Sequence, residues 1–175
     1  DIKLTERGAI AVDEYCQTSV ENIFAVGDVN GGPQFTYISL DDSRIVLNYL
    51  NGDKDYSLKN RGAVPTSTFT NPPLATVGLD EKTAKEKGYQ VKSNSLLVSA
   101  MPRAHVNNDL RGIFKVVVDT ETNLILGARL FGAESHELIN IITMAMDNKI
   151  PYTYFQKQIF THPTMVENFN DLFNF

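Results

Sequence analysis

The chain contains 175 residues, 42% of them hydrophobic, so it can form one domain or one and a half around a real core. Its 16 basic and 21 acidic residues give a net charge of -5, which argues against a nucleic-acid-binding surface. No apolar run approaches the roughly 18 residues of a membrane span. One cysteine and three scattered histidines exclude a disulfide framework and argue against a metal site. We therefore expect no nucleic acid, membrane or metal among the partners.

Residues 1–60 carry the pattern of an incomplete α/β domain. Apolar runs at 8–12 and 23–26 predict strands, and a glycine-rich turn leads from the second run into a helix over 36–50. A strand, a glycine loop and a helix in this order are typical of phosphate and nucleotide binding. These elements cannot cover a parallel sheet on both faces. The chain begins at Asp1 without an initiator methionine, so we expect it to continue a longer protein.

Residues 61–175 have the pattern of a complete α+β domain, preceded by a polar segment at 52–61 that reads as a linker. Hairpin-type turns join most of the expected strands, which predicts an antiparallel sheet covered by helices on one side. Met101–Leu110 is polar and is expected to be a loop. Strands are expected at 66–70, 74–77, 89–98, 113–118 and 124–131, and helices at 81–87, at 134–148 and from about 164.

The helix expected at 134–148 is apolar nearly all round, so more than one of its sides should be buried. It is either a deeply packed core helix or part of an interface with a second copy of the chain. A domain of this size rarely buries a whole helix by itself. We therefore expect the interface.

Two places could carry chemistry. Asp28 follows a predicted buried strand, where α/β sheets bind ligands, and its acceptor-only carboxylate suits sugar-like hydroxyls. An ordinary turn in which Asp28 binds local backbone N–H groups explains it equally well. His162 and Glu167 lie near the C-terminus, where Thr164 and Glu167 fit a helix capping box. The alternative is a histidine oriented by a carboxylate for proton transfer, and Glu167 can serve both purposes.

Three other polar residues give weaker evidence of a functional role. Cys16 has no second cysteine and no activating neighbour, so we expect a partly buried small side chain. Asp41 and Asp42 are most simply a solvated helix face.

Four motifs follow one another along the chain: Thr18–Asp28, which matches T-x-x-x-x-[I/V]-[F/Y]-A-x-G-D, then Gly32–Tyr37, Pro72–Glu81, and His162-Pro163-Thr164 with Glu167. In this order they resemble the C-terminal third of the class I flavoprotein pyridine nucleotide–disulfide oxidoreductases, a family that includes glutathione reductase, dihydrolipoamide dehydrogenase and mercuric reductase. Residues 31–37 and 101–105 also resemble a bacterial branch linked to defence against reactive chlorine and hypothiocyanous acid.

This resemblance implies that residues 1–60 end an FAD-binding domain and that residues 61–175 form a dimerisation domain. Gly27 and Asp28 would bind the ribityl-side hydroxyls of FAD. His162, oriented by Glu167, would be the acid–base catalyst. It would act in the active site of the other subunit of a homodimer. The residues that would pass near the isoalloxazine are Gln34, Phe35, Thr36 and Tyr37.

The implied reaction runs from NAD(P)H to FAD, then to a redox-active cysteine pair, then to a disulfide or oxidised small-molecule substrate, in the cytoplasm. The cysteine pair, the first flavin fingerprint and the nicotinamide domain lie outside these residues, and Cys16 does not replace the pair. We therefore expect the chain to be inactive alone. Its tail lacks cysteine, which counts against mercuric reductase and the large thioredoxin reductases. An NADH oxidase or peroxidase of the same superfamily, or a pure dimerisation module, are the alternatives.

Overall fold

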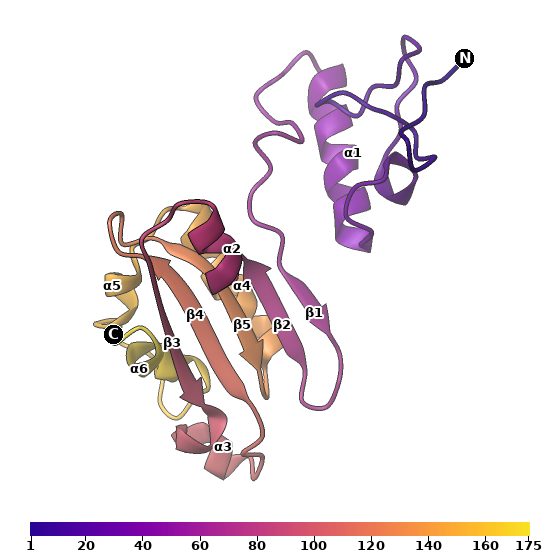
Figure 1. Cartoon of the computed structure of the whole chain (residues 1–175). Helices are drawn as coiled ribbons and strands as arrows, with labels where there is room; N and C mark the ends of the chain where they lie inside the picture. Colours follow the sequence, from indigo (N-terminus) through magenta and orange to yellow (C-terminus); the bar gives the residue numbers. More distant parts are fainter. The chain divides into compact units, whose positions relative to one another are not determined.

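A computed structural model describes all 175 residues and divides them into two compact units, residues 1–62 and 63–175 (Figure 1). We refer to them as unit 1 and unit 2. None of the helices has both the length and the apolar character needed to cross a membrane.

Unit 1 contains one long helix, α1 (Thr36–Leu50), at the position predicted from the sequence, and a 3-10 turn, η1 (Gly27–Asn30). The strands predicted at 8–12 and 23–26 are wrong. These segments pair only through the isolated bridges Leu4–Ile10 and Gln17–Phe24, because unit 1 holds no sheet for them to join.

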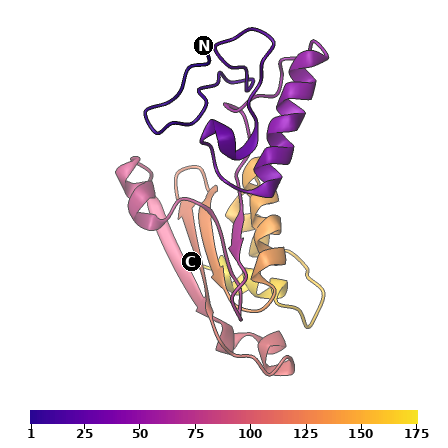
Figure 2. The ribbon, with the colours of Figure 1, turned by 90° about the vertical axis from the view of Figure 1, so that its right-hand side faces the viewer.

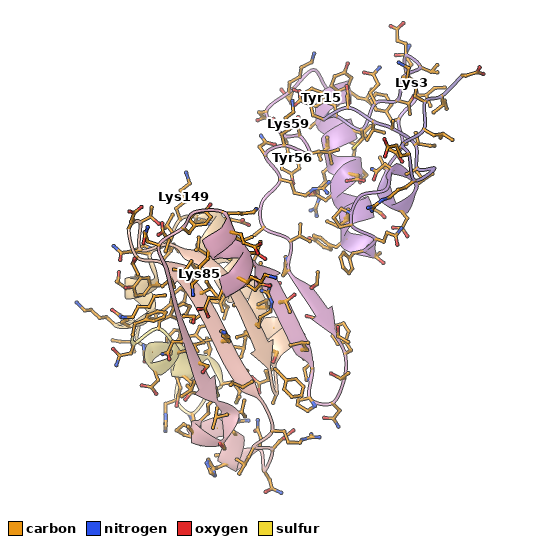
Figure 3. All side chains as sticks on the ribbon, viewed as in Figure 1. Lys3, Tyr15, Tyr56, Lys59, Lys85 and Lys149 are labelled. Carbon is orange, nitrogen blue, oxygen red and sulfur yellow. The ribbon has the colours of Figure 1, made fainter.

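The segment after α1 is folded back rather than loose. The amide N–H of Leu58 donates to the carbonyl of Glu14 at 2.9 Å, and the side chain of Lys59 pairs with the Glu14 carboxylate at 2.9 Å. Figure 3 shows Tyr56 and Lys59 beside α1. The linker expected at 52–61 is therefore an ordered part of unit 1.

Unit 2 is built on a five-stranded sheet of order β1-β2-β5-β4-β3 in which every neighbouring pair is antiparallel. The predicted α+β class is confirmed. The strands are β1 (Thr66–Thr68), β2 (Leu74–Gly78), β3 (Val91–Leu97), β4 (Ile113–Asp119) and β5 (Ile125–Phe131).

Seven helical segments, most of them short, belong to unit 2. Asp80 caps the helix predicted at 81–87 by accepting the N–H of Thr83 at 2.7 Å. The loop expected at 101–110 is wrong in part, because Pro102 at the first helical position and the buried Ala104 allow a short helix. The segments are α2 (Glu81–Glu86), η2 (Val98–Ala100), α3 (Pro102–Val106), α4 (Ser135–Asp147), α5 (Tyr152–Phe155), η3 (Val166–Asn168) and α6 (Phe169–Leu172).

The core of unit 2 lies on one face of the sheet, where α4 and the C-terminal segments pack (Figure 2). Leu138, Ile139 and Ile142 of α4 are buried there. On its other side, Ile141 is 37% exposed and Met144 is 65% exposed. Within one chain α4 is therefore buried on one side only, although it is apolar on both.

The opposite face of the sheet is covered only at one end, by α2. There the Glu81 carboxylate accepts hydrogen bonds from Lys85 and Ser93, which hold the pKa of Glu81 at about 2. At the other end, four large apolar side chains from four neighbouring strands form one row and remain exposed to between 37% and 58%. This row, the sheet-face row, consists of Leu97, Ile113, Phe131 and Leu74.

The aromatic cluster under the C-terminal segment should dominate the stability of unit 2. Phe169 is fully buried, with ring centroids 5.9 Å from Phe155 and 6.0 Å from Phe173. Phe169→Ala should lower the free energy of unfolding by about 3–5 kcal/mol, because it removes this contact area and leaves a cavity. Phe69→Ala, at a side chain that is 78% exposed, is the control and should change it by less than about 0.5 kcal/mol. Chemical denaturation followed by circular dichroism measures both, and equal effects would contradict this packing account.

Candidate functional site

His162 and Glu167 are in direct contact. The Nδ1 atom of His162 lies 3.0 Å and 3.1 Å from the two carboxylate oxygens of Glu167. Because an ionised carboxylate can only accept, Nδ1 carries the proton of this hydrogen bond. The other ring nitrogen, Nε2, is left to exchange a proton with an outside group.

The same carboxylate also caps a helical turn. The amide N–H of Thr164 donates to Glu167 Oε2 at 3.2 Å, and the amide N–H of Glu167 donates to Thr164 Oγ1 at 3.3 Å. These reciprocal bonds form the capping box expected from the sequence. One glutamate therefore fixes both the start of η3 and the ring of His162.

The two side chains differ strongly in exposure. The side chain of Glu167 is 16% exposed and that of His162 is 73% exposed. The carboxylate is thus held in the fold while the imidazole is presented outward. They lie at a surface depression of about 450 Å³ whose wall also includes Ile159, Phe160 and Asn170.

The segment that carries the pair is anchored by the residues that follow His162. Asn168 donates to the carbonyl of Met165 at 3.1 Å, and Asn170 donates to the carbonyl of Phe155 at 2.6 Å. Met165 and Phe169 are fully buried. The position of His162 relative to unit 2 is therefore set by packing and not by a free tail.

The second candidate site lies in unit 1, around η1. Gly27 is buried with a φ of 71°, a conformation that favours glycine, and a Cβ there would lie 2.5 Å from Ser39 Oγ. The turn closes with a hydrogen bond of 3.1 Å from the amide N–H of Gly31 to the carbonyl of Asp28. The Asp28 carboxylate is exposed and has no partner in the chain. The alternative in which Asp28 binds local backbone N–H groups with its side chain is thus not what the structure shows.

The N-terminus of α1 follows this turn directly. Phe35 precedes the helix and provides no side-chain cap. The first amide N–H groups, at Thr36 and Tyr37, therefore have no side-chain acceptor. The side chain of Phe35 is 46% exposed and that of Tyr37 is 66% exposed. Gln34 is exposed next to them. This end of the helix offers free N–H donors beside aromatic surface.

The interpretation of Asp41 and Asp42 as a solvated helix face is wrong. Both residues are buried, at 8% and 1% exposure. The guanidinium of Arg61 contacts both carboxylates, with a distance of 2.6 Å from Nε to Asp41 Oδ2. Burial of two like charges is tolerated because this cation lies between them. No sequence pattern indicates this cluster, since Arg61 lies outside α1 and the helix pattern alone places the two aspartates on a polar face.

Cys16 is fully buried. Burial and the neighbouring charge of Asp42 raise the pKa of its thiol to about 12. A thiol with such a pKa is not a thiolate at neutral pH, so Cys16 lacks the chemistry of a redox-active cysteine.

Comparison with known families gives two matches. The model described as "Pyridine nucleotide-disulphide oxidoreductase, dimerisation domain" matches residues 64–173. The model described as "Pyridine nucleotide-disulphide oxidoreductase" matches residues 1–43. Each match falls within one of the two units.

Curated relatives and solved structures agree with these matches. The probable pyridine nucleotide-disulfide oxidoreductase RclA of Escherichia coli K12 is 51% identical over 173 residues, which are 99% of this chain and 39% of RclA. Mercuric reductase of Staphylococcus aureus is 41% identical over 145 residues, 83% of this chain and 26% of that enzyme. The structure of the HOCl-induced flavoprotein disulfide reductase RclA from Escherichia coli has a TM-score of 0.93 at 50% identity, and covers 98% of this chain and 40% of RclA. The chain thus spans less than half the length of these relatives.

The capping box should contribute to the free energy of unfolding. Thr164→Ala removes the acceptor of the Glu167 amide N–H and should lower the free energy of unfolding by about 1 kcal/mol. Thr164→Ser keeps the hydroxyl and is the matched control, which should stay close to the wild type. Urea denaturation of the three proteins measures the difference. An alanine variant as stable as the serine variant would show that the capping box contributes nothing.

Proposed function

The chain belongs to the pyridine nucleotide-disulphide oxidoreductases, and from this membership we propose that it is the C-terminal part of an RclA-type, NAD(P)H-dependent flavoprotein disulfide reductase. The family resemblance inferred from the four sequence motifs is confirmed. Members of the family depend on FAD and NAD(P)H. In this proposal residues 1–60 complete an FAD-binding domain and residues 61–175 form the dimerisation domain.

The residues of unit 1 fit a flavin nucleotide. The free N–H groups at the start of α1 suit an electron-rich edge of the ring, because a helix N-terminus carries partial positive charge. The exposed surfaces of Phe35 and Tyr37 suit an aromatic ligand, and the unpartnered Asp28 carboxylate suits its ribityl hydroxyls. We assign Gly27 and Asp28 to the ribityl side, and Gln34, Phe35, Thr36 and Tyr37 to the isoalloxazine side. FAD supplies the electron chemistry when it is bound.

His162 then serves as the acid–base residue. The observation that carries this assignment is the hydrogen bond between its Nδ1 atom and Glu167, which leaves Nε2 as the atom that exchanges the proton. A protonated Nε2 donates to a leaving thiolate, and a neutral one removes a proton from an attacking thiol. The hydrogen bond from Nδ1 to Glu167 keeps the ring aligned.

We propose that a second copy of the chain binds unit 2. Ile141 and Met144 leave one side of α4 apolar and exposed, and the sheet-face row leaves a second apolar surface. Monomeric proteins rarely expose large apolar patches, so such surfaces mark interfaces. His162 points outward from this unit, as a residue must if it works in the active site of the partner subunit.

The substrate class is a disulfide or an oxidised small molecule, and NAD(P)H as electron donor is consistent with action in the cytoplasm. The buried thiol of Cys16 cannot replace a redox-active cysteine pair. The 175-residue chain alone should therefore have no reductase activity. The competing account is a dimerisation module, because the capping box by itself is enough to explain Glu167.

Substitutions in the full-length protein separate these two accounts. His162→Gln should lower kcat by about 10²–10⁴-fold, the usual contribution of a general acid or base, with unchanged flavin content and Tm. Glu167→Gln retains an acceptor for the capping box and loses the charge, so its kcat should fall by a smaller factor. His105→Gln, at an exposed histidine whose Nε2–H donates to the carbonyl of Ser99, is the control and should turn over normally. Normal turnover of His162→Gln would contradict the catalytic role of His162 and support the account in which unit 2 is a dimerisation module.

A further inference from the structure

Asp42 holds the η1 turn onto α1. Its Oδ2 atom accepts two hydrogen bonds from the turn, at 2.7 Å from the amide N–H of Gly27 and at 2.9 Å from the side-chain amide of Asn30. Asp42 is 1% exposed, so water cannot replace these donors. The residue next to Gly27 in this turn is Asp28.

The other oxygen of Asp42, Oδ1, contacts the guanidinium of Arg61. Desolvation of a lone carboxylate would be costly, and the guanidinium offsets it. The side chain of Arg61 is itself only 13% exposed. Arg61 thus gives the buried Asp42 carboxylate a counter-ion inside unit 1, and a hydrogen bond between an amide and a carboxylate is stronger than one between neutral groups.

Asp42 lies less than two turns from the start of α1, where Thr36 and Tyr37 present free N–H groups. It thus connects the two halves of the proposed flavin site through one rigid helix. We propose that Asp42 is a positioning residue for the flavin: it fixes the Asp28 carboxylate relative to the N-terminus of α1, with Arg61 as its counter-ion. This inference rests on the proposed function.

Asp41 provides a matched comparison. It shares Arg61, at 2.6 Å from Nε, and accepts the hydroxyl of Tyr56 at 2.8 Å (Tyr56 is labelled in Figure 3). None of its hydrogen bonds or ion pairs involves the η1 turn. Loss of its charge disturbs the same buried ion cluster and leaves the hydrogen bonds of Gly27 and Asn30 in place.

The test compares Asp42→Asn with Asp41→Asn in the full-length protein. After removal of the flavin, FAD is titrated back, and its dissociation constant is measured by the change in flavin fluorescence. The flavin midpoint potential is recorded on the reloaded proteins. Asp42→Asn should raise the dissociation constant by about tenfold, the effect of one charge-assisted hydrogen bond, and should shift the potential. Asp41→Asn should lose stability and stay within about twofold of the wild type in affinity.

The outcomes distinguish failure of the proposed function from failure of the inference about Asp42. If the wild-type protein binds no FAD, the proposed function fails. If the wild type binds FAD and the two aspartate variants bind it equally well, Asp42 does not position the flavin. Should Asp42→Asn not fold, Asn30→Ala decides, because it removes one of the two donors and leaves Asp42, Asp41 and Arg61 unchanged. An unchanged FAD affinity and potential in Asn30→Ala would then overturn the inference.

Discussion

The carboxylate of Glu167 is the contact on which the C-terminal part of this chain depends. It closes a helical turn through Thr164 and orients His162 through Nδ1. Helix capping and orientation of a neighbouring imidazole are usually alternative explanations for a glutamate, and here one side chain makes both sets of hydrogen bonds. The buried aromatic cluster around Phe169 keeps this glutamate in place, so the stability of the core and the alignment of the imidazole are connected.

Asp42 has a comparable role in unit 1. Both carboxylates are held inside the fold, and each directs a neighbouring polar group outward, the imidazole of His162 in one unit and the carboxylate of Asp28 in the other. The exposed groups make no further contact with their own chain that would block a ligand. The rigid groups are buried and the exposed groups are free to meet a ligand, which is the arrangement that our proposal of a flavin site in unit 1 and of a catalytic histidine in unit 2 requires.

The sequence predicted regular elements well and the buried polar contacts poorly. The boundaries of α1 follow from its glycine and asparagine signals, and the hairpin order of unit 2 follows from turn residues and alternation. The strands at 8–12 and 23–26 failed because an apolar run becomes a strand only beside a pairing partner. Asp41 and Asp42 were misread because their counter-ion, Arg61, is distant in sequence. The motif around His162 predicted that Glu167 could contact both Thr164 and His162, and the structure shows both contacts.

Complementation between two inactive variants tests most directly whether His162 of one subunit completes the active site of the other. Two full-length variants are mixed under conditions that exchange subunits, one with His162→Gln and one without its redox-active cysteines. Each should be inactive alone. If His162 acts across the dimer, random pairing restores about a quarter of the wild-type activity, because half of the dimers then hold one intact site of two. If mixed dimers form and no activity returns, His162 does not act in the partner subunit, and the account is wrong.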